Sequence, residues 1–379
     1  MNAVNTADPE TPGDAGKLPL AVLDLAHIGA GSSASEALKN SVDLARTAER
    51  LGYSRYWFAE HHGMPSIASS APEILIGHVA SATATIRVGS GGIMLPNHAP
   101  LRIAEAFHTL QALHPGRIDL GIGRAPGADR AAMAAMRPFD AEQFPAQLQE
   151  MFALSRGEFP AGHAFHGVRA VPSDVRLPPV WLLGSSGASA RLAGALGLGY
   201  SFASHFSRTS ASPPIAAYRA AFEPSLEFAR PHAILAVSVV CADTSERAEF
   251  LAGSLDLSWL RFRRQEFAPI PTPEEAAAYD YDATERAFIA ENRATHFVGT
   301  PEQVVERIAS VAQQTGADEV MVTTMVHAHA DRRRSFELLA ERWAAHGLTA
   351  TPGPAAGSQP AVAVAPTVTA NSAEPHSQP

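Results

Sequence analysis

The sequence predicts a (β/α)8 barrel of the TIM type, an α/β fold, with an insertion near strands seven and eight. Short apolar or β-branched runs alternate with amphipathic helical segments, which is typical of βα units around a parallel sheet. Eight such runs can be counted, enough to close a barrel. About 330 residues lie between two tails rich in Pro, Ala, Ser and Thr, a length that this fold reaches around one core.

The tails show no helical or strand periodicity. We therefore expect residues 1–17 and 348–379 to be disordered and the barrel domain to span residues 18–347. The predicted strands are, in chain order, residues 20–25, 55–60, 86–91, 117–123, 180–184, 200–204, 233–241 and 319–326.

Local signals predict helix ends and an insertion. Ser35 is expected to cap the first helix, which should stop near Gly52. Thr300 is expected to begin a helix as its N-cap, because Pro301 and Gln303 complete a strong start signal. From about 255 to 297 an Arg- and Pro-rich stretch interrupts the alternation, and we expect it to form a lid on the rim of the barrel.

Composition narrows the choice of partner and compartment. The net charge is -9, from 38 acidic and 29 basic residues without a basic block, which argues against nucleic acid or an anionic membrane and favours a small-molecule substrate. The single cysteine, Cys241, lies in an apolar run and is expected to be buried and structural. The chain shows no signal-peptide pattern and no apolar run long enough to span a bilayer, so we expect it to be cytoplasmic.

Two of the predicted strand ends, GSGGIMLP (89–96) and GIGRAPG (121–127), are poor in side chains. The carboxyl ends of barrel strands carry the active site, and small residues there let a flat ligand approach the backbone. A dinucleotide-binding fingerprint is not supported, because GIGRAPG follows the fourth strand and spaces its glycines as GxGxxxG. Ordinary glycine-rich turns are the alternative.

A third strand end, LLGSSGAS (182–189), enters a predicted helix and predicts an anion site. Its small and hydroxyl residues surround the positive end of the helix dipole, where backbone N–H groups are free. The residues concerned are Ser185, Ser186, Gly187 and Ser189. A serine that simply caps the helix is the alternative.

Two histidine pairs are candidates for chemistry. His61 and His62 follow the second strand, and one imidazole could act there as a general acid or base, whereas a structural histidine is the alternative. His327 and His329 near the end of the last strand would fit a metal-dependent hydrolase. Because the first strand ends with only His27 and no HExxH motif or cysteine cluster occurs, we expect no metal site.

Taken together, six segments in this order resemble the bacterial luciferase-like flavin-dependent monooxygenase family, over about residues 18–345. They are DLAHIGAG, RYWFAEHHGMPSIASSAPEILIGHVA, IRVGSGGIMLPNHAPLRIAEAF, HPGRIDLGIGRAPG, VWLLGSSGASARLAGALG and VGTPEQVVERIASVAQQTGADEVMVTTMV. The resemblance implies a barrel that binds reduced FMN, reacts it with O2 and oxygenates a small organic substrate. It is specific to the family and does not identify the substrate.

The resemblance also assigns roles to residues. Gly91 and Gly92 match a strand-three site where a non-prolyl cis peptide often lies against the flavin. The phosphate-binding turn is matched by Ser185, Ser186 and Ser189, with Gly187 between them, and a nearby phosphate-binding arginine by Arg124, for which a rim salt bridge is the alternative.

Two further matches concern the reaction itself. His61 matches a histidine proposed to shuttle a proton, with neighbouring His62 also available. Gly123 stands where light-emitting members carry a reactive cysteine, so we do not expect luciferase activity, and monooxygenation stays open.

Partners and alternatives follow from the same resemblance. No NAD(P)H-binding motif is found, so we expect reduced flavin to come from a separate flavin reductase in a two-component system, and members of the family often form homodimers. Some relatives use the deazaflavin F420 and are dehydrogenases or reductases. A non-catalytic flavin-storage protein is a third alternative.

Overall fold

The computed structural model describes residues 18–136 and 140–348, so apart from Leu348 the two expected tails lie outside the described residues. Eight parallel strands form a closed barrel in the order β1-β2-β3-β4-β5-β6-β7-β9, with β9 pairing back to β1. They are β1 (Leu20–Asp24), β2 (Arg55–Phe58), β3 (Arg87–Met94), β4 (Ile118–Gly123), β5 (Val180–Gly184), β6 (Gly199–Ala203), β7 (Ala233–Cys241) and β9 (Glu319–Thr323). The predicted fold class is confirmed.

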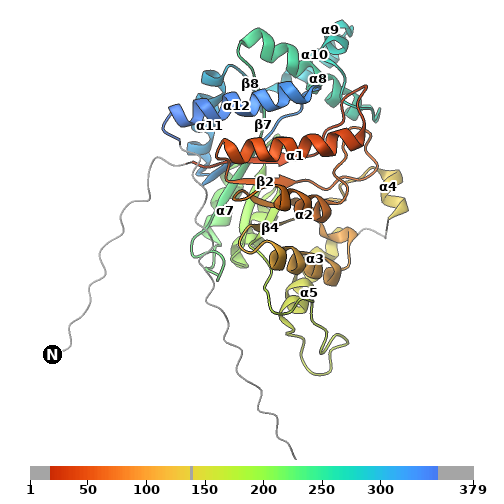
Figure 1. Cartoon of the computed structure of the whole chain (residues 1–379), viewed down its shortest axis with the longest axis vertical. Coiled ribbons are helices and arrows are strands. Elements are labelled where there is room, and N and C mark those ends of the chain that lie inside the picture. The colour runs from red at the N-terminus through yellow and green to blue at the C-terminus, as the bar shows by residue number, and fades with distance from the viewer. Residues whose placement is uncertain (1–17, 137–139, 349–379) are drawn as a thin grey trace, which may run out of the picture.

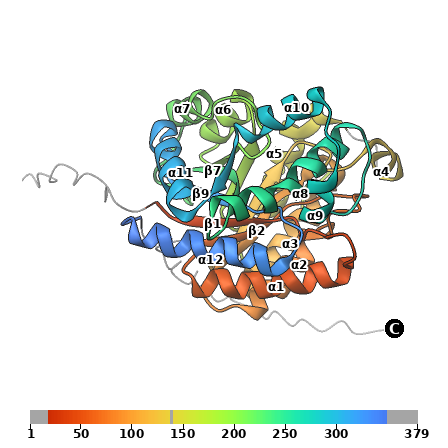
Figure 2. The same cartoon turned by 90° about the horizontal axis from the view of Figure 1, so that it is seen from above.

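Helices surround this barrel (Figure 1). They are α1 (Ala34–Arg50), α2 (Pro72–Ala82), α3 (Pro100–Leu113), α4 (Arg130–Ala135), α5 (Phe144–Arg156), α6 (Gly187–Ala195), α7 (Ser212–Ala220), α8 (Ser245–Arg263), α9 (Pro273–Ala278), α10 (Ala283–Arg293), α11 (Pro301–Thr315) and α12 (His329–Ala345). Both views show α1 and α12 side by side, so the first and last helices cover neighbouring strands (Figures 1 and 2). Within the described residues, none of the helices is both long and apolar enough to cross a bilayer.

Two predicted helix starts had different outcomes. Thr300 caps α11 as predicted, and Gln303 completes a reciprocal capping box. The cap of α1 is Ser33, whose Oγ accepts a hydrogen bond of 3.1 Å from the Glu36 backbone N–H, so the prediction of Ser35 was wrong by two residues. The segment contains several serines with similar capping ability, and only the path of the chain into the helix selects one.

The predicted insertion is present, but it is longer and largely helical. It consists of α8, α9, α10 and the short strand β8 (His296–Gly299), and it begins before residue 255. β8 pairs with the part of β7 from Ser238 to Cys241, where β7 extends beyond β9. Sequence reasoning missed β8 because four residues are too few to show a periodicity.

The core has two layers. Apolar side chains between the barrel and its helices form the larger cluster, in which Cys241 is buried as predicted. Inside the barrel a smaller cluster contains Trp57 and Trp181, whose rings meet edge to face. Below them, at the amino-terminal end of the strands, Arg55 lies between buried carboxylates. The barrel is therefore filled, and a ligand has room only at its carboxyl end.

Candidate active site

The glycines of β3 lie within the strand, which continues to Met94 instead of ending at residue 91. The peptide bond between Gly91 and Gly92 is cis, and the register with β4 shifts near it. A Cβ atom on Gly91 would lie 2.7 Å from Leu23 Cδ1, and one on Gly92 would lie 2.7 Å from the Gly121 carbonyl oxygen. Close packing against the backbone of β4 therefore requires glycine at position 92 independently of any ligand, whereas a side chain at position 91 would have to displace Leu23.

Gly123 and Arg124 lie where β4 leaves the barrel. A Cβ atom on Gly123 would lie 2.9 Å from Met94 Sδ, so a cysteine there would have to displace Met94. Arg124 is exposed, and it makes no hydrogen bond or ion pair with the residues that the structure describes. Its guanidinium group is free to bind an anion.

The entrance to α6 has the features of an anion site. Ser186 occupies the N-cap position, but its side chain makes no capping hydrogen bond. The Oγ of Ser189 donates to the Ser186 carbonyl oxygen at 3.1 Å, so it also leaves the first N–H groups uncapped. Ser185 is exposed beside them. Ser186 therefore does not act as a simple capping serine. The helix dipole favours an anion at the free N–H groups of this entrance.

Sequence reasoning missed Arg191 at this entrance. It is exposed, and its Nη1 atom lies 3.3 Å from where a Cβ atom on Gly187 would be. Residues four apart lie on one helix face, so the spacing between Gly187 and Arg191 could have indicated that Arg191 lies at this entrance.

Glu60 organises the end of β2. Its Oε1 atom lies 2.8 Å from Nε2 of both His62 and His98, and its Oε2 accepts the Met94 backbone N–H at 2.9 Å. Burial acts to raise the pKa of Glu60, but the hydrogen bonds from His62, His98 and Met94 outweigh it and lower the pKa to about 2. The pKa of His62 is raised, chiefly by its hydrogen bond to Glu60. His62 is therefore engaged in supporting the site.

His61 points to the other side. Its Nδ1 atom is shielded from solvent and has no hydrogen-bond partner among the described residues. Burial lowers the pKa of His61 to about 4, so the imidazole is neutral at physiological pH.

Two further histidines, which the sequence analysis did not assign to the site, resemble His61. His205 follows β6, and its Nδ1 is shielded without a partner in the described part of the chain; burial lowers its pKa to about 4. Both ring nitrogens of His27, after β1, are likewise unpartnered, and burial lowers its pKa to about 3. The signal that could have found them is their position one to three residues past a strand end.

The hydroxyl groups of Thr323 and Thr324 at the end of β9 are also buried without a partner among the described residues. The carboxyl ends of four barrel strands thus carry shielded polar atoms, an arrangement that native cores otherwise avoid. These unpartnered atoms are uncharged and lie at the end of the barrel that carries the active site in this fold.

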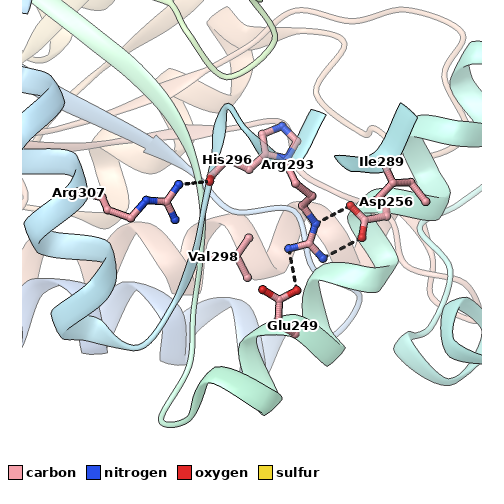
Figure 3. Close-up of a pocket in the computed structure, with 7 residues that line it drawn as sticks. All are labelled: Glu249, Asp256, Ile289, Arg293, His296, Val298 and Arg307. Atoms are coloured by element: carbon pink, nitrogen blue, oxygen red, sulfur yellow. Dashed lines mark hydrogen bonds and ion pairs between the residues drawn. The ribbon is translucent and has the colours of Figure 1, made fainter. Parts of the chain in front are cut away.

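Two cavities are lined by the insertion, one of them together with α11. One of about 270 Å³ lies between α8, α10, β8 and α11 (Figure 3). Arg293 crosses it with both guanidinium edges occupied, by Asp256 at 2.7 and 2.8 Å and by Glu249 at 3.3 Å. A second cavity of about 350 Å³ lies between α8, α9 and α10. No predicted cofactor residue lines either cavity, so we place the site at the strand ends.

The two histidines considered for a metal face different partners. The Nε2 atom of His327 lies 2.9 Å from the Ala30 carbonyl oxygen, and that of His329 lies 2.9 Å from Asp43 Oδ2. In the part of the chain that the structure describes, no three His, Cys, Asp or Glu side chains are grouped to hold a metal ion. The geometry gives no support to a metal-dependent hydrolase.

Comparison with known proteins identifies relatives along the whole barrel. A family model described as luciferase-like monooxygenase matches residues 18–319. A luciferase-like monooxygenase of Escherichia coli (strain K12) is 43% identical over 324 residues, which are 85% of this chain and 96% of the relative. The uncharacterized protein YvbT of Bacillus subtilis (strain 168) is 46% identical over 327 residues, 86% of this chain and 96% of that protein. The crystal structure of apo-MsnO8 matches with a TM-score of 0.79 and 36% identity, covering 86% of this chain and 98% of that one.

Proposed function

The chain belongs to the luciferase-like monooxygenase family, and from this premise we propose that it is a two-component, FMN-dependent monooxygenase. Reduced FMN would supply two electrons for the activation of O2, so that one oxygen atom enters a small organic substrate and the other leaves as water. A separate reductase would supply the flavin. The observation that carries this proposal is the uncapped entrance of α6, which lies at the same end of the barrel as the unpartnered polar atoms that follow the strands.

The phosphate of FMN would bind between the ends of β4 and β5. These strands pair directly, with Ile122 opposite Leu182, so Arg124 and the α6 entrance follow neighbouring strands. Serine hydroxyls, uncapped N–H groups and a guanidinium fork are the donors that a phosphate dianion prefers. The proposed ligands are Arg124, Ser185, Ser186, Gly187 and Ser189, with Arg191 added by the structure.

The flavin ring would lie over the ends of β3 and β4, beside Gly91, Gly92 and Gly123. His61 would hold or move a proton there, because a neutral imidazole can accept a proton at a nitrogen that no protein group occupies. His62 would keep its place on Glu60. A structure of similar fold, the oxygenating constituent of 3,6-diketocamphane monooxygenase from Pseudomonas putida, was solved with FMN; it is 19% identical, with a TM-score of 0.63.

Anaerobic titration of the apo-protein tests the cofactor. We expect reduced FMN to bind more tightly than reduced F420, followed by absorbance and fluorescence, and O2 to reoxidise the bound FMN. A Ser186→Ala, Ser189→Ala double variant should bind FMN more weakly, whereas Ser33→Ala, which removes a true cap on another helix, should not affect binding. Tight binding of F420 without binding of FMN would instead indicate a dehydrogenase or reductase.

The two-component proposal has its own test. Purified protein with NADPH and FMN should consume NADPH no faster than FMN alone, and addition of a flavin reductase should start O2 consumption. Rapid oxidation of NADPH by the protein alone would contradict the need for a reductase. FMN binding without any O2 consumption would indicate flavin storage.

A further inference from the structure

Three imidazoles follow separate strands at the mouth of the barrel. β2 and β6 occupy opposite positions in the eight-stranded ring, and the carboxyl ends of all eight strands surround one mouth. His61 contributes to the lowered pKa of His205, which fits two rings on opposite sides of this mouth. His61 and His205 therefore border the same mouth.

His27 joins them from the adjacent strand. β1 pairs with β2 so that Asp24 lies opposite Phe58, and His27 and His61 each follow these partners by three residues. Both residues also flank the segment 66–69, because His27 bridges to Ile67 and the His61 backbone N–H donates to the Ser69 carbonyl oxygen at 3.0 Å.

The backbone before His27 is held in an uncommon conformation. Ala26 has a φ of +50°, which is rare for a residue with a side chain and is found preferentially at functional sites. Its N–H donates to Asp24 Oδ1 at 2.7 Å, and Arg332 Nη2 donates to the same oxygen at 2.6 Å. This buried turn fixes the direction in which His27 leaves the strand.

The ring nitrogens in this space have no protein partner. Both nitrogens of His27 and the Nδ1 atoms of His61 and His205 are shielded without a hydrogen bond in the described part of the chain. A buried polar atom left unpaired destabilises the protein, so a partner from outside the chain is expected. Because each neutral imidazole has one donor and one acceptor nitrogen, the three rings together present both kinds of site.

The charged groups around the rings are already neutralised. Asp24 is paired with Arg332, and Glu60 accepts hydrogen bonds from His62 and His98. On the far side of His205, His296 is a fourth buried imidazole whose pKa is lowered to about 4 by burial and by Arg293, itself paired with Asp256. A carboxylate here would bury a charge without a cationic partner, because these surroundings keep the imidazoles neutral.

We propose that His27, His61 and His205 form the binding site for an uncharged substrate group that both donates and accepts hydrogen bonds, such as a primary amide or a hydroxyl. The site discriminates against a carboxylate of the same size. The inference rests on the proposed function in assigning this group to the substrate.

Histidine NMR on the full-length apo-protein tests the site without flavin or turnover. The probes are hexanamide and hexanoate, which have the same chain length and differ in charge. At neutral pH we expect hexanamide to shift the ring signals of all three histidines, each assigned by its variant, and hexanoate to need at least about tenfold more ligand for the same shift.

Variants of His27 separate binding from folding. His27→Phe should weaken hexanamide at least about tenfold, whereas His27→Asn, which retains a donor and an acceptor, should keep most of the affinity. If His27→Phe does not fold, His205→Gln against His205→Leu gives the same comparison. The control His346→Phe, at the exposed end of α12, should bind like the unaltered protein.

Three outcomes would overturn the proposal: no ring shift with hexanamide, equal binding of hexanoate at neutral pH, or unchanged binding by both His27 variants. A failure of the proposed function looks different. If the proposed function were wrong, the protein would not bind reduced FMN, but hexanamide would still shift the ring signals of the histidines.

Discussion

The two ends of the barrel contain buried polar groups in opposite states. At the amino-terminal end, Arg55 Nη1 donates to Asp119 Oδ2 and Nε to Glu319 Oε1, both at 2.8 Å, and Trp57 Nε1 adds a bond of 3.1 Å to Asp119. At the carboxyl end, the imidazole of His27 is uncharged and makes no hydrogen bond with the described residues. The Arg55 cluster is charged and satisfied, whereas the imidazoles of His27, His61 and His205 at the other end are neutral and keep nitrogens without a partner among the described residues.

This difference separates stability from function within one fold. A buried ion pair with all partners present needs nothing from outside, and losing one member leaves an uncompensated charge. Unpartnered neutral imidazoles contribute little to folding, and they gain partners only when a ligand binds. We therefore expect substitutions at the amino-terminal end to reduce stability and those at the carboxyl end to reduce binding and catalysis.

The largest effect on stability is expected for Arg55→Met. It would leave buried Asp119 with Arg87 alone and buried Glu319 with His232 alone, and it should lower the free energy of unfolding by about 3–5 kcal/mol, measured by urea denaturation. Arg208→Met is the control, because its ion pair with Glu291 is exposed and should contribute less than about 1 kcal/mol. Equal effects of the two substitutions would remove the contrast between the ends.

At the carboxyl end of the barrel, His61→Gln should lower the rate of the reaction with O2. Loss of a positioned acid or base lowers a rate by about 10²–10⁴-fold, so we expect slower O2-dependent reoxidation of bound FMN with little change in unfolding free energy or FMN affinity. His62→Gln is the matched control. If it slowed the reaction as much as His61→Gln, the assignment of the proton-transfer role to His61 would be wrong.

The pH dependence of stability should separate the neutral imidazoles from the ionised carboxylates. The folded-state pKa values of His27, His61 and His205 lie at about 3–4, below the ordinary value of 6.5. Because these rings are neutral in the folded protein, they cost no stability above pH 6.5, and stability is lost as the pH falls toward 4, by up to about 1.4 kcal/mol per pH unit for each. The pKa of Glu319 is lowered from 4.5 to about 2, because Arg55 and His232 outweigh burial, so its contribution is lost only below pH 4.5.

Denaturant unfolding over a series of pH values measures these two ranges. His205→Phe should reduce the slope of the unfolding free energy against pH between 6.5 and about 4. It should leave the loss of stability that comes from Glu319, below pH 4.5, unchanged. An unaltered slope between pH 6.5 and 4.5 in this variant would mean that His205 is already hydrated in the folded protein.

The smallest effect on stability is expected for Ser186→Ala. Its hydroxyl makes no capping bond, so the free energy of unfolding should change by less than about 0.5 kcal/mol, whereas Ser33→Ala should cost about 1 kcal/mol. FMN affinity should respond in the reverse order, falling for Ser186→Ala alone, as isothermal titration can show. A similar stability loss in both variants would show that Ser186 acts as an ordinary cap.

Sequence patterns predicted the fold and only part of the candidate site. The eight barrel strands were recognised because short apolar runs alternate with helical segments along the chain. The capping box at Thr300 was recognised because it is contained within four residues. The Gly123–Arg124 turn was recognised by a local motif. The role of Glu60 was missed because His98 and Met94, which bind it, lie on a different strand and loop.

By itself the sequence determined the number of barrel strands and their order along the chain. The family-specific series of motifs predicted that these strands close into a barrel, and the serines predicted the hydroxyl-rich entrance to α6. Each of these features depends on residues close together in the chain. Only the tertiary structure decided that β8 pairs with the end of β7, that Ser33 is the cap, and that His27, His61 and His205 follow strands around one barrel mouth. Pairing register and ring closure bring these groups together, and register is a relation between distant segments that no local pattern contains.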